Sequence, residues 1–491
     1  MQQPHENAAP AAESTGQAEE LHRGLSNRHI QLIAIGGAIG TGLFMGSGKA
    51  ISKAGPSILL VYIVIGAAIF LVLRAMGEIL LSNLKYKSFS DFTADLVGRP
   101  AGFFLGWSYW FMWVVTAVAD IIAIVDYSQL WWPNLPKAIP ALIVIIALLA
   151  LNLPSVKNFG EIEFWFAMIK IVAICALILV GIVMVATSFT TRDGSHAQIA
   201  NLWEHGGFFP NGVFGFLGAF QIAIFAFMGS ELVGTTAAET QNPTVTLPKA
   251  INSVPVRIII FYVGALLVIL MVNPWNEIDP AKSPFVTMFS LAGIAIAAHV
   301  VNAVVLTSAT SSANSGIFST SRMVYGLAQE GDAPKSLGVL SVQGVPRNAL
   351  FLTSTLLLSS IVLLYAGDSI IGAFTLVTTM AAVLVIFVWS MILISYLCYR
   401  RKRPQLHTQS VYRMPGGVVM CWVVLAFFAF SVCILATAED TRAGLMLMPI
   451  WFGGLAIGWF VKNKLHPEVP ETSITQSNPI VDLKQTSDDK K

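Results

Sequence analysis

The sequence predicts an all-α integral membrane protein with about twelve transmembrane helices. Charged residues make up only 11% of the 491 residues, whereas hydrophobic residues make up 55%. A soluble fold of this length has to cover itself with charged and polar side chains, so this composition excludes the soluble classes. The charges are also segregated from apolar runs such as 58–73 and 369–399. Runs of this length can cross a hydrocarbon layer of about 30 Å.

Each predicted span is an apolar segment bounded by charged, proline or glycine residues. The eighth segment is longer than one crossing requires, and we expect it to include a re-entrant or interfacial part. In chain order the predicted spans are 30–51, 57–82, 101–128, 138–154, 162–187, 212–238, 256–274, 285–325, 349–366, 370–398, 417–437 and 444–461.

The basic residues orient these spans. With the N-terminus in the cytoplasm, about 21 Lys and Arg residues fall on inner segments and about 6 on outer ones, as the positive-inside rule requires. Both termini are therefore expected in the cytoplasm. The predicted organisation is a disordered arm at 1–24, a core of helices 1–10 at 25–398, a loop with helices 11 and 12 at 399–464, and a disordered tail at 465–491. Nothing in the sequence indicates an oligomeric state.

The first span contains an unusual density of glycine, because Gly36, Gly37, Gly40 and Gly42 lie close together. Glycine weakens a helix and exposes its backbone groups, which lipid tolerates only where the backbone is packed in protein or lines a wet cavity. Gly36 and Gly40 also form a G-x-x-x-G pair, typical of close helix packing. Since the glycines cover all faces of the segment, they favour a broken helix over a packing face.

The sixth span has a matching interruption at 225–231, where a glycine and a carboxylate fall inside an apolar segment. Interruptions at corresponding positions in two halves of a chain are typical of transporters built from inverted repeats. The sequence therefore predicts a core of five plus five helices with broken helices 1 and 6, followed by two additional C-terminal helices.

The two interruptions together predict a site for a zwitterion. A half-helix that starts near Gly40 directs free N–H groups and a positive dipole end at a carboxylate. The unwound carbonyls of the sixth span can accept hydrogen bonds from an ammonium group. This pattern fits the backbone of an amino acid, and the predicted substrate-binding residues are Gly40, Thr41, Gly42, Phe225, Ala226 and Met228.

Ionisable residues inside the spans are candidates for function, because each is costly in lipid unless it is paired or working. Lys170 lies two turns into the fifth span; a lysine that snorkels to the interface is the structural alternative. Glu231 lies at the break of the sixth span, where it handles a proton or faces substrate, or else pairs with Lys170. Glu239 lies near the cytoplasmic end of that span, where a solvated role is equally compatible.

Three further charges lie in the second and third spans. Arg74 and Glu78 are four residues apart on one helical face, so we expect them to pair with each other. Asp120, in the outer part of the third span, has no partner that the sequence can assign.

Several classes of activity lack their motifs. The chain contains no metalloprotease, phosphate-loop or nucleophile-elbow motif, and its four cysteines form no C-x-x-C pair. We therefore expect neither an enzyme, a metal site nor a cofactor. The basic run 400–403 fits a cytoplasmic loop with some contact to lipid head groups, and nothing suggests nucleic acid.

Seven segments of this chain resemble the amino acid permeases of the amino acid–polyamine–organocation superfamily, and within it the bacterial proton-coupled amino acid transporter branch. The resemblance extends from Arg28 to about Lys464. The segments that carry it are 26–32, 36–42, 54–56, 77–78, 225–231, 234–240 and 313–323.

The resemblance implies an inverted-repeat core with alternating access around a midplane site. It places carboxylate binding on Gly40, Thr41 and Gly42, and amine binding on the carbonyls of the sixth helix. A lysine that occupies the place of a coupling sodium in some relatives matches Lys170, and an acidic residue on the sixth helix matches Glu231. The resemblance also places two serines of the eighth helix, Ser311 and Ser312, near the same region.

The function that the resemblance implies is import of small neutral amino acids across the bacterial plasma (inner) membrane by proton symport. The expected substrates are glycine, D-alanine and D-serine, with D-cycloserine as an analogue, and the coupling ion is H⁺. Two alternatives stay open at this point. One is a permease for another amino acid, such as an aromatic residue, proline or γ-aminobutyrate. The other is an amino-acid sensor that binds substrate without transporting it.

Overall fold

The computed structural model describes residues 39–86, 88–154, 156–235, 242–366 and 369–465. Within these ranges every regular element is a helix, and the β pairing is limited to an isolated bridge between Thr190 and His196. The prediction of an all-α protein is confirmed for this part of the chain. Gly36, Gly37, Glu239, the predicted arm at 1–24 and the predicted tail after residue 465 lie outside the described residues.

Nine helices of the described chain are long and apolar enough to cross a membrane, which confirms a multi-pass membrane protein. One of the nine stretches, Gly46–Ser82, runs through the end of the predicted first span and the whole of the second. Two more predicted spans correspond to shorter apolar helices, Ala138–Asn152 and Gly212–Ala226.

The helices of the first part of the chain are α2 (Thr41–Phe44), α3 (Gly46–Ala54), α4 (Ile58–Ser82), α5 (Phe89–Leu96), α6 (Arg99–Ser128), α7 (Ala138–Asn152) and α8 (Val156–Ala186). Those of the middle part are α9 (Gly212–Gly218), α10 (Phe220–Ala226), α11 (Leu232–Thr235), α12 (Pro243–Asn252), α13 (Val254–Arg257), the π-helical segment η4 (Ile258–Gly264), α14 (Ala265–Val272), α15 (Pro284–Leu291) and α16 (Ala295–Gln329). Those of the last part are α17 (Arg347–Leu356), α18 (Ser359–Ala366), α19 (Ile370–Lys402), α20 (Pro404–Gln409), α21 (Gly417–Thr437), α22 (Glu439–Met446) and α23 (Met448–Leu465). Short 3₁₀ turns lie at Gly55–Ser57, Ile199–Leu202, Trp275–Glu277 and Lys335–Gly338.

Glycines with positive φ mark three sharp changes of direction. Gly55 (φ +58°) ends α3, and a side chain there would collide with the ring of Pro210. Gly229 (φ +91°) lies in the turn that separates α10 from α11. Gly293 (φ +79°) separates α15 from α16, so the long eighth segment forms two helices instead of one.

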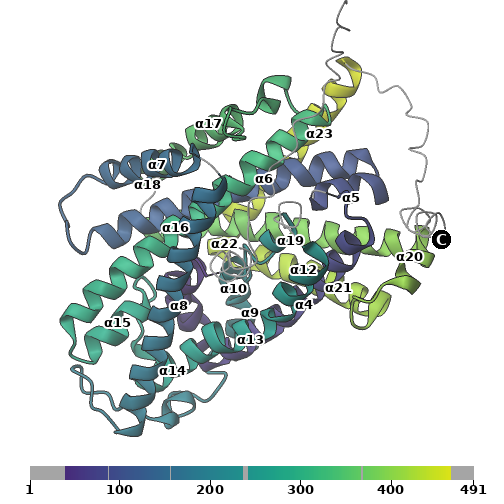
Figure 1. Ribbon diagram of the computed structural model, residues 1–491. Coiled ribbons are helices and arrows are strands. Elements are labelled where there is room, and N and C mark those ends of the chain that lie inside the picture. The colour runs from purple at the N-terminus through teal and green to yellow at the C-terminus, as the bar shows by residue number, and fades with distance from the viewer. Residues whose placement is uncertain (1–38, 87, 155, 236–241, 367–368, 466–491) are drawn as a thin grey trace, which may run out of the picture. The chain divides into compact units, whose positions relative to one another are not determined.

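The enclosed centre of the bundle is α6, which packs along α16 and α19 (Figure 1). Its most hydrophobic stretch is almost wholly buried, whereas α8 and α21 leave most of theirs exposed on apolar faces. Trp165, Val172 and Leu179 of α8 illustrate such a face. An exposed face of this kind is compatible with lipid, and the buried helices carry the polar side chains considered next.

The predicted Arg74–Glu78 pair is wrong. Glu78 accepts hydrogen bonds from the backbone N–H of Met414 (2.7 Å) and contacts Nδ1 of His407 (2.5 Å). Arg74 instead donates to the amide oxygen of Asn252 (2.9 Å) and to the carbonyl of Arg413. These partners lie more than 170 residues away along the chain, so helical spacing alone favoured a contact that tertiary packing replaces.

Candidate functional site

A helix N-terminus lies where the sequence predicted a carboxylate-binding backbone. Gly40 is extended (φ −121°, ψ −161°), and α2 begins at Thr41. The carbonyl of Gly40 accepts the amides of Leu43 (3.3 Å) and Phe44 (3.4 Å), and α3 follows directly after Met45. The described half of the first span therefore starts with its positive dipole end at residues 40–42.

The sixth span is interrupted at the predicted position. α10 ends at Ala226, and α11 begins at Leu232. The carbonyl of Phe225 accepts the amide of Met228 (3.1 Å), and the carbonyl of Ala226 accepts the hydroxyl of Tyr262 (3.0 Å). A carbonyl oxygen has two lone pairs, so a carbonyl at this break can accept a further donor where one of its lone pairs is not already used.

The two interrupted segments touch through their backbones. A Cβ atom added to Gly42 would lie 2.5 Å from Cα and 2.8 Å from the backbone nitrogen of Ala226. One turn further on, a Cβ atom on Gly46 would lie 2.6 Å from Cγ2 of Ile222. The glycines of the first span thus allow α2 and α3 to approach α10 more closely than any side chain would permit.

Asp120 of α6 lies beside this junction, fully buried. Its Oδ1 accepts the hydroxyl of Thr41 (2.6 Å), one of the predicted site residues. Ser312 of α16, which the resemblance placed nearby, is close to the same helix start: its Oγ would lie 3.1 Å from a Cβ atom on Gly40. The structure therefore brings Gly40, Thr41, Ser312 and Asp120 together.

Lys170 is fully buried on α8, so it does not snorkel to the surface. Its ammonium interacts electrostatically with two carboxylates, Glu163 and Asp120. Glu163 is also fully buried; its Oε2 accepts Ser311 Oγ (2.7 Å) and its Oε1 accepts the side-chain amide of Asn314 (2.9 Å). Ser311 thus meets the charged cluster from α16, on the same helix as Ser312.

Glu231 lies at the break of the sixth span, fully buried as well. Its carboxylate folds back onto the amide of Gly229, at 3.3 Å and 3.2 Å for the two oxygens. This contact stabilises the turn between α10 and α11. Lys170 is drawn to Glu163 and Asp120, and Glu231 has a separate role in shaping the break.

Two residues of this cluster escaped the sequence prediction. The sequence assigned no partner to Asp120, and Glu163 was not among the predicted site residues. One signal was available for Glu163: it lies seven residues before Lys170, which places both side chains on one face of a helix.

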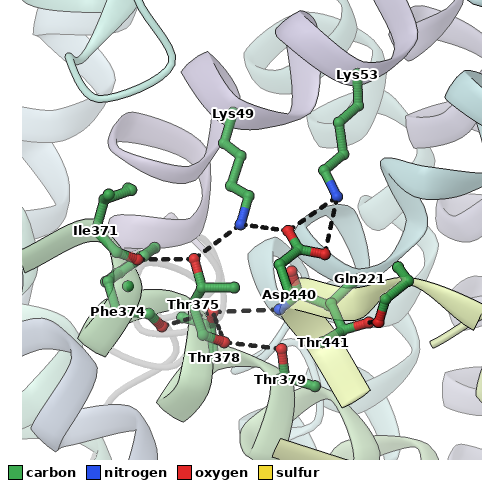
Figure 2. Close-up of polar contacts among 12 residues, drawn as sticks. Lys49, Lys53, Gln221, Ile371, Phe374, Thr375, Thr378, Thr379, Asp440 and Thr441 are labelled. Atoms are coloured by element: carbon green, nitrogen blue, oxygen red, sulfur yellow. Dashed lines mark hydrogen bonds and ion pairs between the residues drawn. The ribbon is translucent and has the colours of Figure 1, made fainter. Parts of the chain in front are cut away.

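Figure 2 shows a second polar cluster, around Asp440 of α22. Asp440 of α22 forms ion pairs with Lys49 (2.7 Å) and Lys53 (3.0 Å) of α3. Lys49 also donates to Thr375 Oγ1 of α19 (2.9 Å). Close by, Gln221 of α10 donates to Thr378 Oγ1 of α19 (3.2 Å), so polar contacts connect α22 to α3, α3 to α19, and α19 to α10.

A stack of rings joins the N-terminal end of α8 to α16. Phe159 and Phe318 lie face to face with their centroids 3.6 Å apart, and the guanidinium of Arg322 lies 3.3 Å from the centroid of Phe318. We call these three residues the inner stack. It lies one helical turn from Glu163 on α8 and from Asn314 on α16.

A charged cluster also lies just beyond the end of α16. Arg99 donates to the carbonyl of Glu330 (3.1 Å) and pairs with Asp332 (3.9 Å). Desolvation and the nearby carboxylates of Asp91 and Asp332 raise the pKa of Glu330 to about 7, against the opposing charge of Arg99. This region is expected to titrate near neutral pH.

Comparison with known proteins assigns nearly the whole chain to one family. The family model for amino acid permeases matches residues 29–469. The D-serine/D-alanine/glycine transporter of Escherichia coli K12 is 59% identical over 459 residues, which cover 94% of this chain and 96% of that protein. An amino-acid permease of Bacillus subtilis is 50% identical (91% and 96% covered), and the aromatic amino acid transport protein of Escherichia coli O6:H1 is 40% identical (91% and 97% covered). The chain therefore belongs to the amino acid permease family.

Proposed function

We propose that this permease imports small neutral amino acids across the bacterial plasma membrane by proton symport, with both termini in the cytoplasm. Glycine, D-alanine and D-serine are the proposed substrates, and D-cycloserine is a proposed analogue. The observation that carries the proposal is the high identity with the Escherichia coli transporter named for these three amino acids. Identity with the aromatic transporter is lower, which favours small substrates over aromatic ones.

The site supports this proposal through the two interrupted helices. The start of α2, at Gly40, Thr41 and Gly42, offers N–H groups to the substrate carboxylate. The end of α10 offers the carbonyls of Phe225, Ala226 and Met228 to the ammonium group. Such a clamp holds only groups that every amino acid has, so either stereoisomer fits when its side chain is small.

Buried bulk around the clamp also favours a small side chain. Phe225, Phe227 and Met228 are buried at the break, and the ring of Phe227 stacks on Tyr262 with centroids 4.7 Å apart. A large substrate side chain would have to displace these groups, at a cost of the order of 1–3 kcal/mol for overpacking.

The proposed architecture is twelve spans, in which two inverted five-helix repeats are followed by two helices. The break between α10 and α11 and the helix start at Thr41 support it, because such interruptions recur at equivalent places in inverted-repeat carriers. Alternating access would then open the clamp to one side of the membrane at a time.

Proton coupling is proposed to centre on Lys170. A sodium ion needs several oxygen ligands, whereas a buried ammonium already supplies the positive charge in this place. Gain and loss of its proton would shift the balance between outward-open and inward-open states. Glu231 is the alternative proton carrier. Its hydrogen bond with the amide of Gly229 would then link its protonation to the conformation of the turn between α10 and α11.

The test is uptake of labelled glycine into liposomes that contain the purified protein. We expect accumulation with an inward proton gradient and none with a sodium gradient at equal pH. D-Alanine and D-serine should compete strongly, and phenylalanine and lysine weakly. Equal competition by phenylalanine would refute the substrate assignment, and sodium-driven accumulation would refute the coupling ion. Binding of glycine without uptake would indicate a sensor.

The matched variants address Lys170. Lys170→Ala should lose proton-driven accumulation, and Lys170→Arg should not restore it, because a guanidinium does not release its proton readily. If Lys170→Ala still accumulates glycine under a pH gradient, Glu231 becomes the proposed carrier, and Glu231→Gln is the next variant to assay.

A further inference from the structure

Glu163 is a buried carboxylate to which the proposed mechanism gives no role. It lies seven residues before Lys170 on α8, about two helical turns away on the same face. Side chains of a helix lean toward its N-terminus, so Lys170 leans toward Glu163. The electrostatic interaction between the two groups agrees with this geometry.

The two carboxylate oxygens of Glu163 have different kinds of hydrogen-bond partner. The partner of Oε1 can only donate, whereas the partner of Oε2 can either donate or accept. Asn152 of α7 donates to Oδ1 of Asn314 (2.7 Å) and to the carbonyl of Leu148 (2.9 Å). This orients the amide of Asn314 so that its nitrogen donates to Oε1 of Glu163. Oε1 therefore always faces a donor.

Oε2 faces the hydroxyl of Ser311, which can donate or accept according to how its hydrogen is turned. When Glu163 is ionised, Ser311 donates to it. When Glu163 is protonated, its O–H can donate to Ser311 Oγ while Asn314 keeps its own bond. This network therefore accommodates both protonation states without moving a heavy atom, which a purely structural carboxylate does not need.

The charged neighbours of Glu163 are few on the elements that pack against α8. α16 contributes the neutral Ser311, Asn314 and Ser315, and α7 contributes the neutral Asn152. Within the described residues, Lys170 is the charged group that interacts with Glu163 electrostatically. Asp120 lies on the other side of Lys170, next to Thr41. The order from the substrate clamp is thus Asp120, Lys170, Glu163.

The inner stack lies beyond Glu163, toward the N-terminal end of α8 that the sequence places in the cytoplasm. Phe159 lies one turn before Glu163 on α8 and stacks on Phe318, and the guanidinium of Arg322 lies over the ring of Phe318. On the path from Glu163 toward the proposed cytoplasmic end, a proton would pass the inner stack, which joins α8 to α16.

We propose that Glu163 accepts the proton of Lys170 and releases it toward the cytoplasm. This inference rests on the proposed proton symport. In the transfer, an N–H bond of the Lys170 ammonium breaks and an O–H bond forms at Oε2 of Glu163. The products are a neutral amine and a neutral carboxylic acid, and Ser311 turns from donor to acceptor. The acid then ionises when the inner stack opens, and the proton passes to water.

The experiment compares two activities of the full-length protein in liposomes. Counterflow of labelled glycine at equal pH needs the substrate site and alternating access but no net proton movement. Accumulation under a pH difference of about one unit, with the acid side outside, needs coupling and is limited to about tenfold for one proton per substrate. Glu163→Gln keeps the size of the side chain but cannot carry a proton. Glu163→Asp keeps the carboxyl group but shortens it, and Glu161→Gln is the control on the same helix.

The proposal predicts that Glu163→Gln retains counterflow while its accumulation ratio falls to about one, that Glu163→Asp regains accumulation at least in part, and that Glu161→Gln resembles the wild type. Wild-type accumulation by Glu163→Gln would overturn it. So would loss of both activities in Glu163→Gln without recovery in Glu163→Asp, since shape alone would then matter. If the wild type itself shows counterflow without proton-driven accumulation, the proposed symport fails, which is a different outcome from failure at Glu163.

Discussion

The contact between Gly42 and Ala226 makes a quantitative prediction for the smallest possible side chain. In Gly42→Ala the new Cβ atom would lie 2.5 Å and 2.8 Å from two backbone atoms of Ala226, where ordinary contacts are 3.4–4 Å. α10 must therefore retreat by about 1 Å, and overpacking of this kind costs about 1–3 kcal/mol. Because the obstructing atoms are backbone and cannot rotate away, we expect a cost near the upper end, about 3 kcal/mol.

The assay combines thermal unfolding of the purified protein with binding of glycine. Gly42→Ala should unfold at a lower temperature, and displacement of the α10 carbonyls should weaken glycine binding by at least about tenfold, which corresponds to 1.4 kcal/mol. Gly326→Ala on α16 is the matched control, because its Cβ atom would meet open space in a helix. It should stabilise the protein by about 0.5–1 kcal/mol. If both variants unfold and bind glycine like the wild type, the close backbone approach does not exist in solution.

Three further predictions concern the charged groups. Asp440→Asn removes the carboxylate that pairs with Lys49 and Lys53 and should lower the free energy of unfolding by about 1 kcal/mol in total; an unchanged unfolding temperature would contradict this. Glu330→Gln should raise the unfolding temperature at pH 8 but not at pH 5. The carboxyl group of Glu330 stays protonated up to about pH 7 in the folded protein but only to about pH 4.5 in the unfolded chain, so the wild type loses stability as the pH rises between these values. A difference in unfolding temperature that does not depend on pH would exclude this titration. Thr41→Val removes the donor to buried Asp120 and should cost about 1–3 kcal/mol in thermal unfolding, whereas Thr41→Ser should not; equal effects would point to packing.

Several helices could be predicted closely from the sequence because their signals are local. The predicted spans 101–128 and 417–437 match α6 and α21 within a few residues, since apolar length and flanking charges define a crossing without reference to the rest of the fold. Gly229 marked the interruption of the sixth span for the same reason: a glycine inside an apolar segment affects the backbone at its own position.

The partners of buried charged residues could not be predicted from such local signals. Glu78 binds His407 and Met414, and Asp120 binds Thr41, and each pair joins helices that are far apart along the chain. Spacing within one helix suggested Arg74 for Glu78, and it suggested no partner for Asp120. Which helices pack together depends on the shape of the whole bundle, which the charge pattern of one segment does not contain.

The two close contacts between the first and sixth spans have a mechanical consequence. Gly42 meets Ala226 and Gly46 meets Ile222, so the helices run in opposite directions and interlock over a full turn. Two helices in such close contact resist bending, and we expect them to move as one rigid body. The hinges of this movement are then expected outside the contact, at the extended residue Gly40 before α2 and at Gly229 after α10. A substrate held between these helices would move with them. The distance between the groups that bind its carboxylate and those that bind its ammonium would then stay constant during the movement.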